Sequence, residues 1–352
     1  MKKKSQYIEA LCKELELRKE YLQGEPIQTI YFGGGTPSQL SAEDFQKIFS
    51  QILQNDSDST NSPEITFEAN PDDITPHYLE SLKKLPFNRI SLGIQSFNDS
   101  ELSFLNRRHN AQSAIQAVRI CQEYGFKNIS IDLMYGLPNQ TKQIWKANLQ
   151  LALELNIQHI SAYHLIYEEG TKLDELLRKR KIASVDEELS VEMFSEMIDL
   201  LAANGFEHYE ISNFAKPGFI SRHNSSYWNG TRYLGIGASA HSFDGKNRHW
   251  NVSNLDNYID TINKGKLPQE TEIIGVKEAY NDFILTRMRT IKGLNLTELE
   301  TLFGEEKKNY CLRQVQKHLN NQTVQLQDNY LKLTRKGIFI SDGIMSDLFV
   351  SF

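Results

Sequence analysis

Short runs rich in β-branched and aromatic residues alternate with stretches of helical periodicity through the first 205 residues. This alternation is typical of βα units, and connections long enough to hold a helix predict parallel strands. Apolar runs such as 129–134 predict strands covered on both faces, and both an open doubly wound sheet and a barrel fit the pattern. A polar stretch at 55–62 is expected to be a solvated loop. The expected strands lie at 27–34, 64–70, 89–97, 128–138 and 159–167, and the expected helices at 41–54, 76–85, 111–124, 141–155 and 186–204.

The ends of the expected strands favour the barrel. In a parallel barrel the C-terminal ends of the strands meet at one mouth, whereas an open sheet spreads them along an edge. Nearly every strand here ends in glycine or polar residues, which such a mouth would bring together. These residues are Gly33–Thr36, Glu68–Asn70, Gln95, Ser96, Asp132 and His164.

Two regions depart from the repeat. Residues 6–22 show an amphipathic helical pattern that no strand precedes, although a βα repeat begins with a strand. Beyond residue 205 the repeat breaks, and the last segment has two helical patterns followed by an expected hairpin. We therefore predict an α/β fold with three parts: a partial (β/α) barrel of parallel strands that lacks its first strand at 1–205, an irregular extension at 206–275, and a small, mostly helical, winged-helix-like domain at 276–352.

The composition indicates a protein of the cytoplasm. The net charge is −6 and the Lys and Arg residues are spread along the chain, so no basic stripe would follow a nucleic-acid backbone. Lys2–Lys4 precede polar residues, not the apolar core of a signal peptide. No apolar run approaches the roughly 18 residues of a membrane-spanning helix. We expect neither a nucleic-acid partner nor a membrane span.

The cysteines do not form a metal-binding pattern. Cys12, Cys121 and Cys311 are separated by about a hundred residues or more, which is unlike the spacing of a ligand cluster. Cys12 and Cys121 fall in helical patterns, where we expect them to be small apolar residues. No metal ligand is assigned.

The strongest local signal is the glycine-rich loop Gly33–Pro37. Three glycines after a strand let the backbone approach a ligand closely and turn its N–H groups toward it. The loop matches neither the dinucleotide-binding fingerprint nor the P-loop. The alternative is a tight βα turn that binds nothing.

Several segments together give the chain a resemblance to a known family. The segments GGGTP, ITFEANP, SLGIQSF, LNRRH, IDLMYGLP, YLGIGASAHSF and LTRKG occur in this order from the loop to the C-terminal region. In them the chain resembles the radical-SAM superfamily, in particular the HemN-like branch of oxygen-independent coproporphyrinogen III oxidases. The resemblance implies S-adenosylmethionine as a cofactor. It implies that the methionyl end is held by Gly34, Gly35 and Thr36, and that ribose, carboxylate and neighbouring groups are bound by Glu68, Gln95, Arg107 and Asp132.

Ordinary hydrogen bonding is consistent with these roles. A carboxylate accepts hydrogen bonds from ribose hydroxyls, and an Arg guanidinium forks onto a carboxylate. Taken singly, Glu68 or Asp132 could equally belong to an ion pair at the mouth of the barrel.

A second motif narrows the resemblance within the branch. Arg222–Trp228 contains HNxxYW, in which the chain resembles the HemW heme chaperones. This implies heme as a ligand and an acceptor hemoprotein as a partner, such as a respiratory, membrane-associated enzyme. A His beside aromatic rings suits axial ligation or stacking of a porphyrin. The alternative is a buried, hydrogen-bonded His in a loop held by Trp228. The heme candidates are His223, Tyr227, Trp228 and His241, with His249 beside Trp250 as a weaker one.

The chain departs from the family at its beginning. Radical-SAM proteins hold a [4Fe-4S] cluster with three cysteines in a CxxxCxxC loop after the first strand, and this sequence contains neither. Cys12 cannot replace the loop, because one thiol on a helix does not supply three ligands. We expect an N-terminal truncation, and the alternative is a relative that has lost the cluster.

Three functions follow from the resemblance. The first is a heme chaperone, and no catalytic residue is assigned to it. The second is oxidative decarboxylation of coproporphyrinogen III, which needs an electron from the cluster and is not expected of the chain in this form. The third is a cluster-free scaffold that binds neither porphyrin nor cofactor.

Overall fold

The computed structural model describes residues 3–54 and 62–350. Apart from Ser62, the polar loop expected at 55–62 lies outside the described residues. The chain forms two compact units, which we describe separately. The half-barrel unit contains Tyr31–Gln39 and Glu64–Ser221, and the composite unit contains Met1–Ile30, Leu40–Pro63 and Arg222–Phe352.

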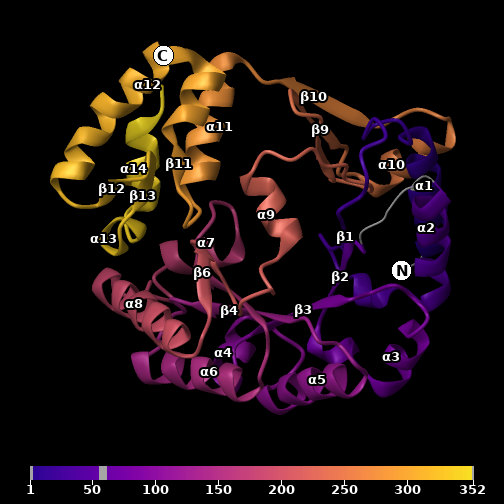
Figure 1. Cartoon of the computed structure of the whole chain (residues 1–352). Coiled ribbons are helices and arrows are strands. Elements are labelled where there is room, and N and C mark those ends of the chain that lie inside the picture. Colours follow the sequence, from indigo (N-terminus) through magenta and orange to yellow (C-terminus); the bar gives the residue numbers. More distant parts are fainter. Residues whose placement is uncertain (1–2, 55–61, 351–352) are drawn as a thin grey trace. The chain divides into compact units, whose positions relative to one another are not determined.

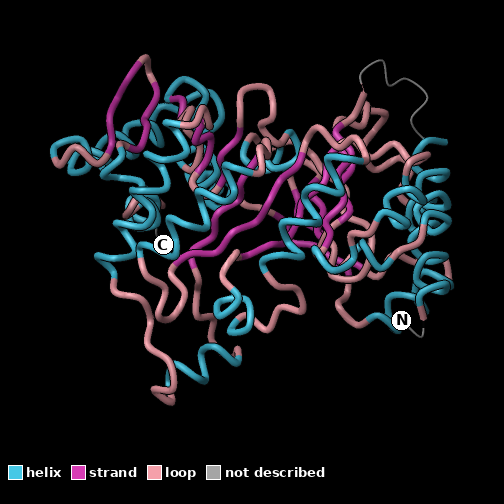
Figure 2. The backbone as a smooth tube through the Cα atoms, turned by 90° about the horizontal axis from the view of Figure 1, so that it is seen from below, coloured by secondary structure: helices cyan, strands magenta, loops and turns pink. Residues whose placement is uncertain are grey.

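A seven-stranded sheet forms the centre of the half-barrel unit (Figures 1 and 2). Strands β2 to β5 pair in parallel, as the sequence predicts, whereas β7 pairs antiparallel with β5 and with β6. The strand order β1-β2-β3-β4-β5-β7-β6 leaves β1 and β6 at the edges, so the curled sheet is an open half-barrel. The strands are β1 (Thr29–Phe32), β2 (Glu64–Ala69), β3 (Arg89–Gln95), β4 (Ile129–Tyr135), β5 (His159–His164), β6 (Glu207–Glu210) and β7 (Asn213–Ala215).

Helices cover one face of this sheet (Figure 1). Each of the six α-helices of the unit begins after a Thr, Asn or Asp whose side chain accepts a hydrogen bond from a backbone N–H of the first turn. Such caps fix where a helix starts, which makes these boundaries predictable from sequence. The helices are α3 (Pro76–Leu82), α4 (Asp99–Phe104), α5 (Ala111–Glu123), α6 (Lys142–Glu154), α7 (Lys172–Arg178) and α8 (Glu187–Ala203), with short 3-10 turns at Pro37–Gln39 and Pro71–Asp73.

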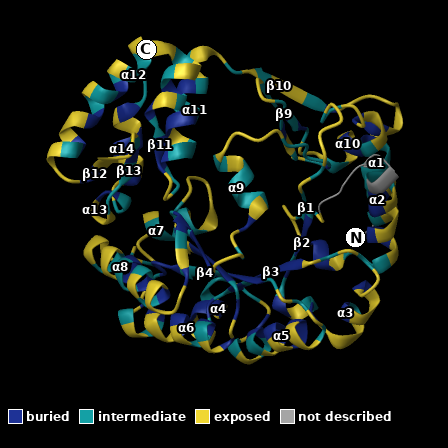
Figure 3. Cartoon of the chain, in the orientation of Figure 1, coloured by how far each residue is buried: buried dark blue, intermediate teal, exposed yellow. Residues whose placement is uncertain are grey.

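The two faces of the sheet differ in polarity. Residues directly opposite each other on paired strands point to the same face, and successive residues of one strand alternate between faces. One row across the strands is wholly apolar: Ala69, Leu92, Ile131, Ile160 and Phe214. The adjacent row is polar across β2 to β5, with Glu68, Ser91, Ser130 and His159, and it ends at Ala215 of β7. The strands are largely buried, as expected (Figure 3), but only one of their faces is apolar.

Hydrogen bonds satisfy the buried polar face. The imidazole of His159 is fully buried and pairs with Ser130 Oγ through Nδ1 at 2.7 Å and with Tyr209 Oη through Nε2 at 2.8 Å. Burial lowers the pKa of His159 well below its ordinary value, so the ring is neutral. A neutral imidazole can donate with one nitrogen and accept with the other.

The composite unit contains the first helix and most of the C-terminal part of the chain. Two three-stranded antiparallel sheets, β10-β9-β8 and β11-β13-β12, lie among its helices. Its last part has two helices followed by a hairpin, as predicted. Its elements are α1 (Lys4–Leu17), α2 (Ala42–Gln54), α9 (Arg222–Trp228), β8 (His241–Phe243), β9 (Asn247–Asn251), α10 (Leu255–Asn263), β10 (Gln269–Ile273), α11 (Val276–Met288), β11 (Leu294–Asn295), α12 (Leu296–Asn320), β12 (Val324–Gln327), β13 (Tyr330–Leu333), α13 (Arg335–Ile338) and α14 (Ser341–Leu348).

A buried carboxylate ties α1 to the rest of this unit. Glu14 is fully buried and accepts hydrogen bonds from Arg18 Nε and Asn251 Nδ2, both at 2.8 Å, through Oε1. Its Oε2 accepts from Gly237 N at 2.9 Å and from Tyr258 Oη at 2.6 Å. All the partners except Arg18 come from a segment more than 200 residues further along the chain, so α1 is fixed by tertiary contacts.

Two expectations about elements are wrong. The first helix ends at Leu17, not at residue 22, because the chain turns after Arg18 and takes up positive φ at Gln23 and Gly24. The region 206–275 is not irregular: β6 and β7 extend the main sheet, and three more strands form a sheet of their own. All five of these strands are three to five residues long, too short to show periodicity in the sequence. The three-part domain division stays a prediction.

No helix in the described parts of the chain is long and apolar enough to cross a lipid bilayer. The cytoplasmic location stays a prediction.

Candidate functional site

The glycine-rich loop leaves β1 beside the carboxylate of Glu68. A Cβ atom on Gly33 would overlap the ring of Tyr31 and lie 2.8 Å from Glu68 Oε1, so no other residue fits there without a shift. Gly34 has φ +71°, a left-handed conformation that favours glycine. Gly34 and Gly35 are exposed, and a Cβ on either would meet nothing within 4 Å. The loop therefore presents bare backbone next to a carboxylate.

Glu68 is oriented by a tyrosine that the sequence analysis did not select. Tyr31 Oη donates a hydrogen bond to Glu68 Oε1 at 2.6 Å. Burial raises the pKa of Glu68, and the hydrogen bonds from Tyr31 and from the backbone N–H of Gly34 offset part of this rise. The carboxylate of Glu68 is therefore held by one donor from the end of β1 and one from the glycine-rich loop.

Gln95 and Arg107 meet above Gly93 of β3. Gln95 Nε2 and Arg107 Nη2 would each lie 3.3 Å from a Cβ on Gly93. Gln95 has φ +70° at a register shift of β3, a strained conformation for a residue with a side chain. Arg107 donates through Nη2 to Asn70 Oδ1 at 2.8 Å and to the carbonyl oxygen of Gly93 at 2.9 Å. These hydrogen bonds leave Nε and Nη1 of the guanidinium for a ligand carboxylate.

Asp132 lies on the polar face of β4. Ser91 Oγ donates to its Oδ1 at 3.4 Å, and Ser161 also hydrogen-bonds to it. Burial and the negative charge of Glu68 raise the pKa of Asp132 to about 7, although Arg89 and the two serines act in the opposite direction. The carboxyl group is therefore near the midpoint of its titration at neutral pH.

Arg89 is a second residue that the sequence analysis missed. It is 2% exposed at the start of β3, and its Nε has no hydrogen-bond partner among the described residues. Its positive charge stabilises the anionic form of Asp132. It also offsets part of the rise in the pKa of Tyr31 that burial and Glu68 cause. Tyr31, Asn70 and Arg89 all lie in or beside the motifs quoted above, but their partners Glu68, Arg107 and Asp132 are 37 or more residues away and only the fold reveals them.

The side chains and backbone of these half-barrel residues have the hydrogen-bonding chemistry that S-adenosylmethionine requires. Desolvated carboxylates accept hydrogen bonds from ribose hydroxyls or from an amine. A guanidinium with N–H donors to spare binds a carboxylate, and exposed glycine backbone lets the cofactor approach closely. The structure brings Gly34, Glu68, Gln95, Arg107 and Asp132 into this one unit, next to shared neighbours. Thr36 is exposed, and the hydrogen bond that its carbonyl oxygen accepts comes from Gln39, not from any of these site residues.

The chain's residues do not fit an iron–sulfur cluster. Cys12 is half-buried on α1, and Cys121 and Cys311 are buried on α5 and α12. Burial raises the pKa of Cys121 to about 12 and that of Cys311 to about 11, so these thiols are protonated. Within the described ranges no three His, Cys, Asp or Glu residues are grouped as metal ligands. We derive no step through a cluster.

The heme candidates all lie in the composite unit. His223 is on α9, not in a loop, and Nδ1 pairs with Thr29 Oγ1 at 3.0 Å while Nε2 pairs with Tyr227 Oη at 3.1 Å. Tyr227, 39% exposed, also contacts Tyr233 edge to face at 4.9 Å between ring centroids.

The other candidates have different surroundings. His241 is exposed at the start of β8, and its ring lies 6.0 Å from that of Trp250. Trp228 lies under the guanidinium of Arg289 at 5.0 Å, and its carbonyl oxygen accepts from Arg287. His249 is buried, with Nδ1 paired to Thr271 and Nε2 to Asp244.

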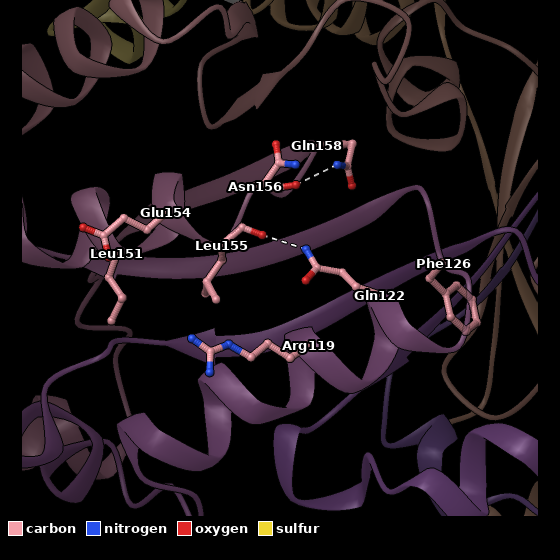
Figure 4. Close-up of a pocket in the computed structure, with 8 residues that line it drawn as sticks. All are labelled: Arg119, Gln122, Phe126, Leu151, Glu154, Leu155, Asn156 and Gln158. Atoms are coloured by element: carbon pink, nitrogen blue, oxygen red, sulfur yellow. Dashed lines mark hydrogen bonds between the residues drawn. The ribbon is translucent and has the colours of Figure 1, made fainter.

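A pocket of about 410 Å³ in the half-barrel unit is lined by none of the candidate residues (Figure 4). It is lined by the C-terminal ends of α5 and α6 and by residues just before β5. This is the N-terminal end of the parallel strands, whereas the cofactor candidates lie toward the C-terminal end. Its charged residues, Arg119 and Glu154, are not joined by any ion pair that the structure describes, and no nucleophile lines it.

Comparison with known proteins identifies the fold of the chain. A family model described as "Radical SAM superfamily" matches residues 6–152, and one described as "HemN C-terminal domain" matches residues 276–340. A structure of coproporphyrinogen III oxidase (HemN) from Escherichia coli superposes with a TM-score of 0.81 and 22% identity, over 98% of this chain and 83% of that one. The fold is that of a HemN-like radical-SAM protein.

Curated relatives identify the family more closely. Heme chaperone HemW of Lactococcus lactis subsp. lactis is 32% identical over 96% of this chain and 88% of its own length. Those of Bacillus subtilis and Synechocystis sp. are 35% and 38% identical, over 85% and 86% of this chain and 79% and 73% of their own lengths. The chain belongs to the HemW family.

The crowding at Gly33 gives a prediction about stability. Replacing Gly33 with Ala should lower the free energy of unfolding by about 1–3 kcal/mol, because the new methyl group separates Tyr31 from Glu68. Gly35→Ala is the matched control, since its methyl group would meet nothing within 4 Å, and should change stability by less than about 1 kcal/mol. Urea unfolding of both variants measures this. Equal effects of the two substitutions would contradict the packing described for Gly33.

The titration of Asp132 gives a prediction about pH. Its pKa is raised from the ordinary value of 3.8 to about 7 in the folded chain, so between these values the folded state binds a proton that the unfolded state releases. This contribution to stability is therefore present at low pH and is lost as the pH rises to about 7. Asp132→Asn cannot titrate, so its stability relative to the wild type should increase between pH 4 and 7 and level off above pH 7. Urea unfolding across this range is the measurement, and a difference that does not change with pH would exclude the raised pKa.

Proposed function

We propose that the chain binds heme and transfers it to an acceptor hemoprotein. The observation that carries this proposal is an exposed histidine, His241, beside tryptophan and other aromatic rings in the composite unit. Aromatic rings bind a flat porphyrin through their faces and edges, and an imidazole can ligate its iron. The curated relatives carry the name heme chaperone, which agrees with this chemistry.

We further propose that the half-barrel unit binds S-adenosylmethionine. Glu68 would accept hydrogen bonds from the ribose, Arg107 would hold the carboxylate through Nε and Nη1, and the bare backbone of Gly34 and Gly35 would contact the methionyl end. In cluster-containing radical-SAM proteins this cofactor supplies a radical upon reduction. In this chain its proposed role is binding only.

Hemin titration with a transfer measurement tests the main proposal. The purified chain should bind one hemin with a Kd of about 1 μM or lower and a shifted Soret band. Mixing the loaded chain with the apo form of a b-type cytochrome should then move the heme to the cytochrome. If transfer is direct, its rate increases with the concentration of the acceptor, whereas release into solution makes the rate independent of it. Albumin-bound hemin is the control.

Two results would overturn the proposal. One is the absence of a Soret shift at hemin concentrations well above 1 μM. The other is a transfer rate equal to spontaneous heme loss at every acceptor concentration. Turnover of coproporphyrinogen III under reducing, anaerobic conditions with S-adenosylmethionine would favour the enzyme hypothesis instead.

A further inference from the structure

The backbone turns sharply at the end of β3, at a residue of the proposed cofactor site. The backbone N–H of Ser96 donates to the carbonyl oxygen of Ile94 at 2.9 Å, and Gln95 between them has φ +70°. A hydrogen bond between residues two apart, with positive φ at the central one, is the rarer form of γ-turn, which is strained. Such a conformation persists only where the surrounding structure holds it.

Three buried polar side chains, Ser96, Glu101 and Asn148, meet at this turn, and we call them the turn cluster. Ser96 Oγ donates to Glu101 Oε2 at 2.5 Å and accepts from the backbone N–H of Asn98 at 3.0 Å. Asn148 Nδ2 donates to Ser96 Oγ at 3.1 Å and to Glu101 Oε2 at 3.2 Å. Asn148 Oδ1 accepts from the backbone N–H of Phe97 at 2.8 Å. The cluster therefore ties the end of β3 to both α4 and α6.

Asn148 occupies a position of α6 that its neighbours make apolar. Trp145, Leu149 and Ala152 of the same helix are fully buried, and Asn148 is 2% exposed. A buried amide is costly unless its polar atoms are hydrogen-bonded. Within the described residues, every hydrogen bond of this side chain goes to the turn cluster or to the backbone of Phe97. The turn therefore accounts for an asparagine here, and the packing of α6 does not.

The turn cluster also fixes the segment that carries Arg107. Glu101 lies in α4, and the carbonyl oxygen of the next residue, Leu102, accepts from the backbone N–H of Arg107 at 2.9 Å. Glu101 Oε1 is buried without a hydrogen-bond partner in the described part of the chain, so the carboxylate is held by Ser96 and Asn148 through Oε2. A shift of α4 would therefore move the backbone of Arg107 with it.

The two side chains that depend on the turn cluster lie together beside Gly93, as described for the candidate site. We infer that the cluster positions Gln95 and Arg107 to bind the carboxylate of S-adenosylmethionine, with Asn148 joining the turn to α4. This inference rests on the proposed binding of that cofactor by the half-barrel unit. The members of the cluster are positioning residues, because all three are less than a tenth exposed and act through their neighbours.

Two ligands that differ in the carboxylate test this positioning role. 5′-Methylthioadenosine keeps the adenine and ribose of S-adenosylmethionine and lacks its amino and carboxylate groups. Asn148→Ala should weaken the binding of S-adenosylmethionine about tenfold, because Gln95 and Arg107 lose their fixed positions, and should change the binding of methylthioadenosine by less than about twofold. Isothermal titration calorimetry, at a temperature where the variant is folded, measures both dissociation constants. A merely structural role would weaken the two ligands equally.

Trp145→Phe is the matched control on the same helix. It removes a buried hydrogen bond from Trp145 Nε1 to the carbonyl oxygen of Met193 at 3.1 Å, which joins α6 to α8 and not to the turn. This variant should unfold at a lower temperature, since a buried hydrogen bond is lost, and both dissociation constants should stay within about twofold of the wild type. If Asn148→Ala does not fold, Ser96→Ala removes the hydroxyl group of the cluster and should give the same selective loss.

The outcomes separate this inference from the proposed function. Equal weakening of the two ligands by Asn148→Ala, or no weakening of either, would overturn the inference and leave the proposed cofactor binding intact. A selective loss in Trp145→Phe as well would assign the effect to α6 as a whole and overturn it too. Failure of the wild type to bind S-adenosylmethionine would overturn the proposed cofactor binding itself, and this inference with it.

Discussion

The half-barrel depends on strands that bury apolar side chains on one face and polar side chains on the other. The row from Ala69 to Phe214 packs beneath the covering helices, which is the main source of stabilisation for a sheet of this kind. The neighbouring polar row is buried as well, and a buried polar group is costly unless it is hydrogen-bonded. The pairs Ser130–His159 and Tyr31–Glu68 provide such bonds. A slip of one residue in any strand would exchange the two rows, so the same alternation that fixes the register also places Glu68 and Asp132 on one face.

Much of the fold could be predicted from the sequence because its signals are local. Periodicity marked the parallel strands, and capping residues such as Thr141 and Asp186 marked where helices begin. The short hairpin β6–β7 was missed because three or four residues show no periodicity. The end of α1 was missed because Leu22 continues the apolar pattern beyond Leu17, where the helix ends, while the partners that fix α1, such as Asn251 and Tyr258, lie more than 200 residues away.

The residues of the candidate site could be predicted from the sequence, but most of the neighbours that orient them could not. Glu68, Gln95 and Asp132 were selected as polar ends of strands and Arg107 through the family resemblance, and the fold brings all four into one unit. Their orienting neighbours depend on strand pairing and on side-chain contacts over long separations, which a sequence pattern does not specify. The heme candidates show the same limit. The HNxxYW motif draws attention to His223, but only the fold shows that Thr29 and Tyr227 hold its ring.

The central claim is that this HemW-family chain binds heme in its composite unit. A structure determined with hemin bound tests it most directly. The account predicts a porphyrin bound in the composite unit, beside aromatic rings such as that of Trp250. A porphyrin bound in the half-barrel unit, on the polar face beside Glu68 and Asp132, would contradict it.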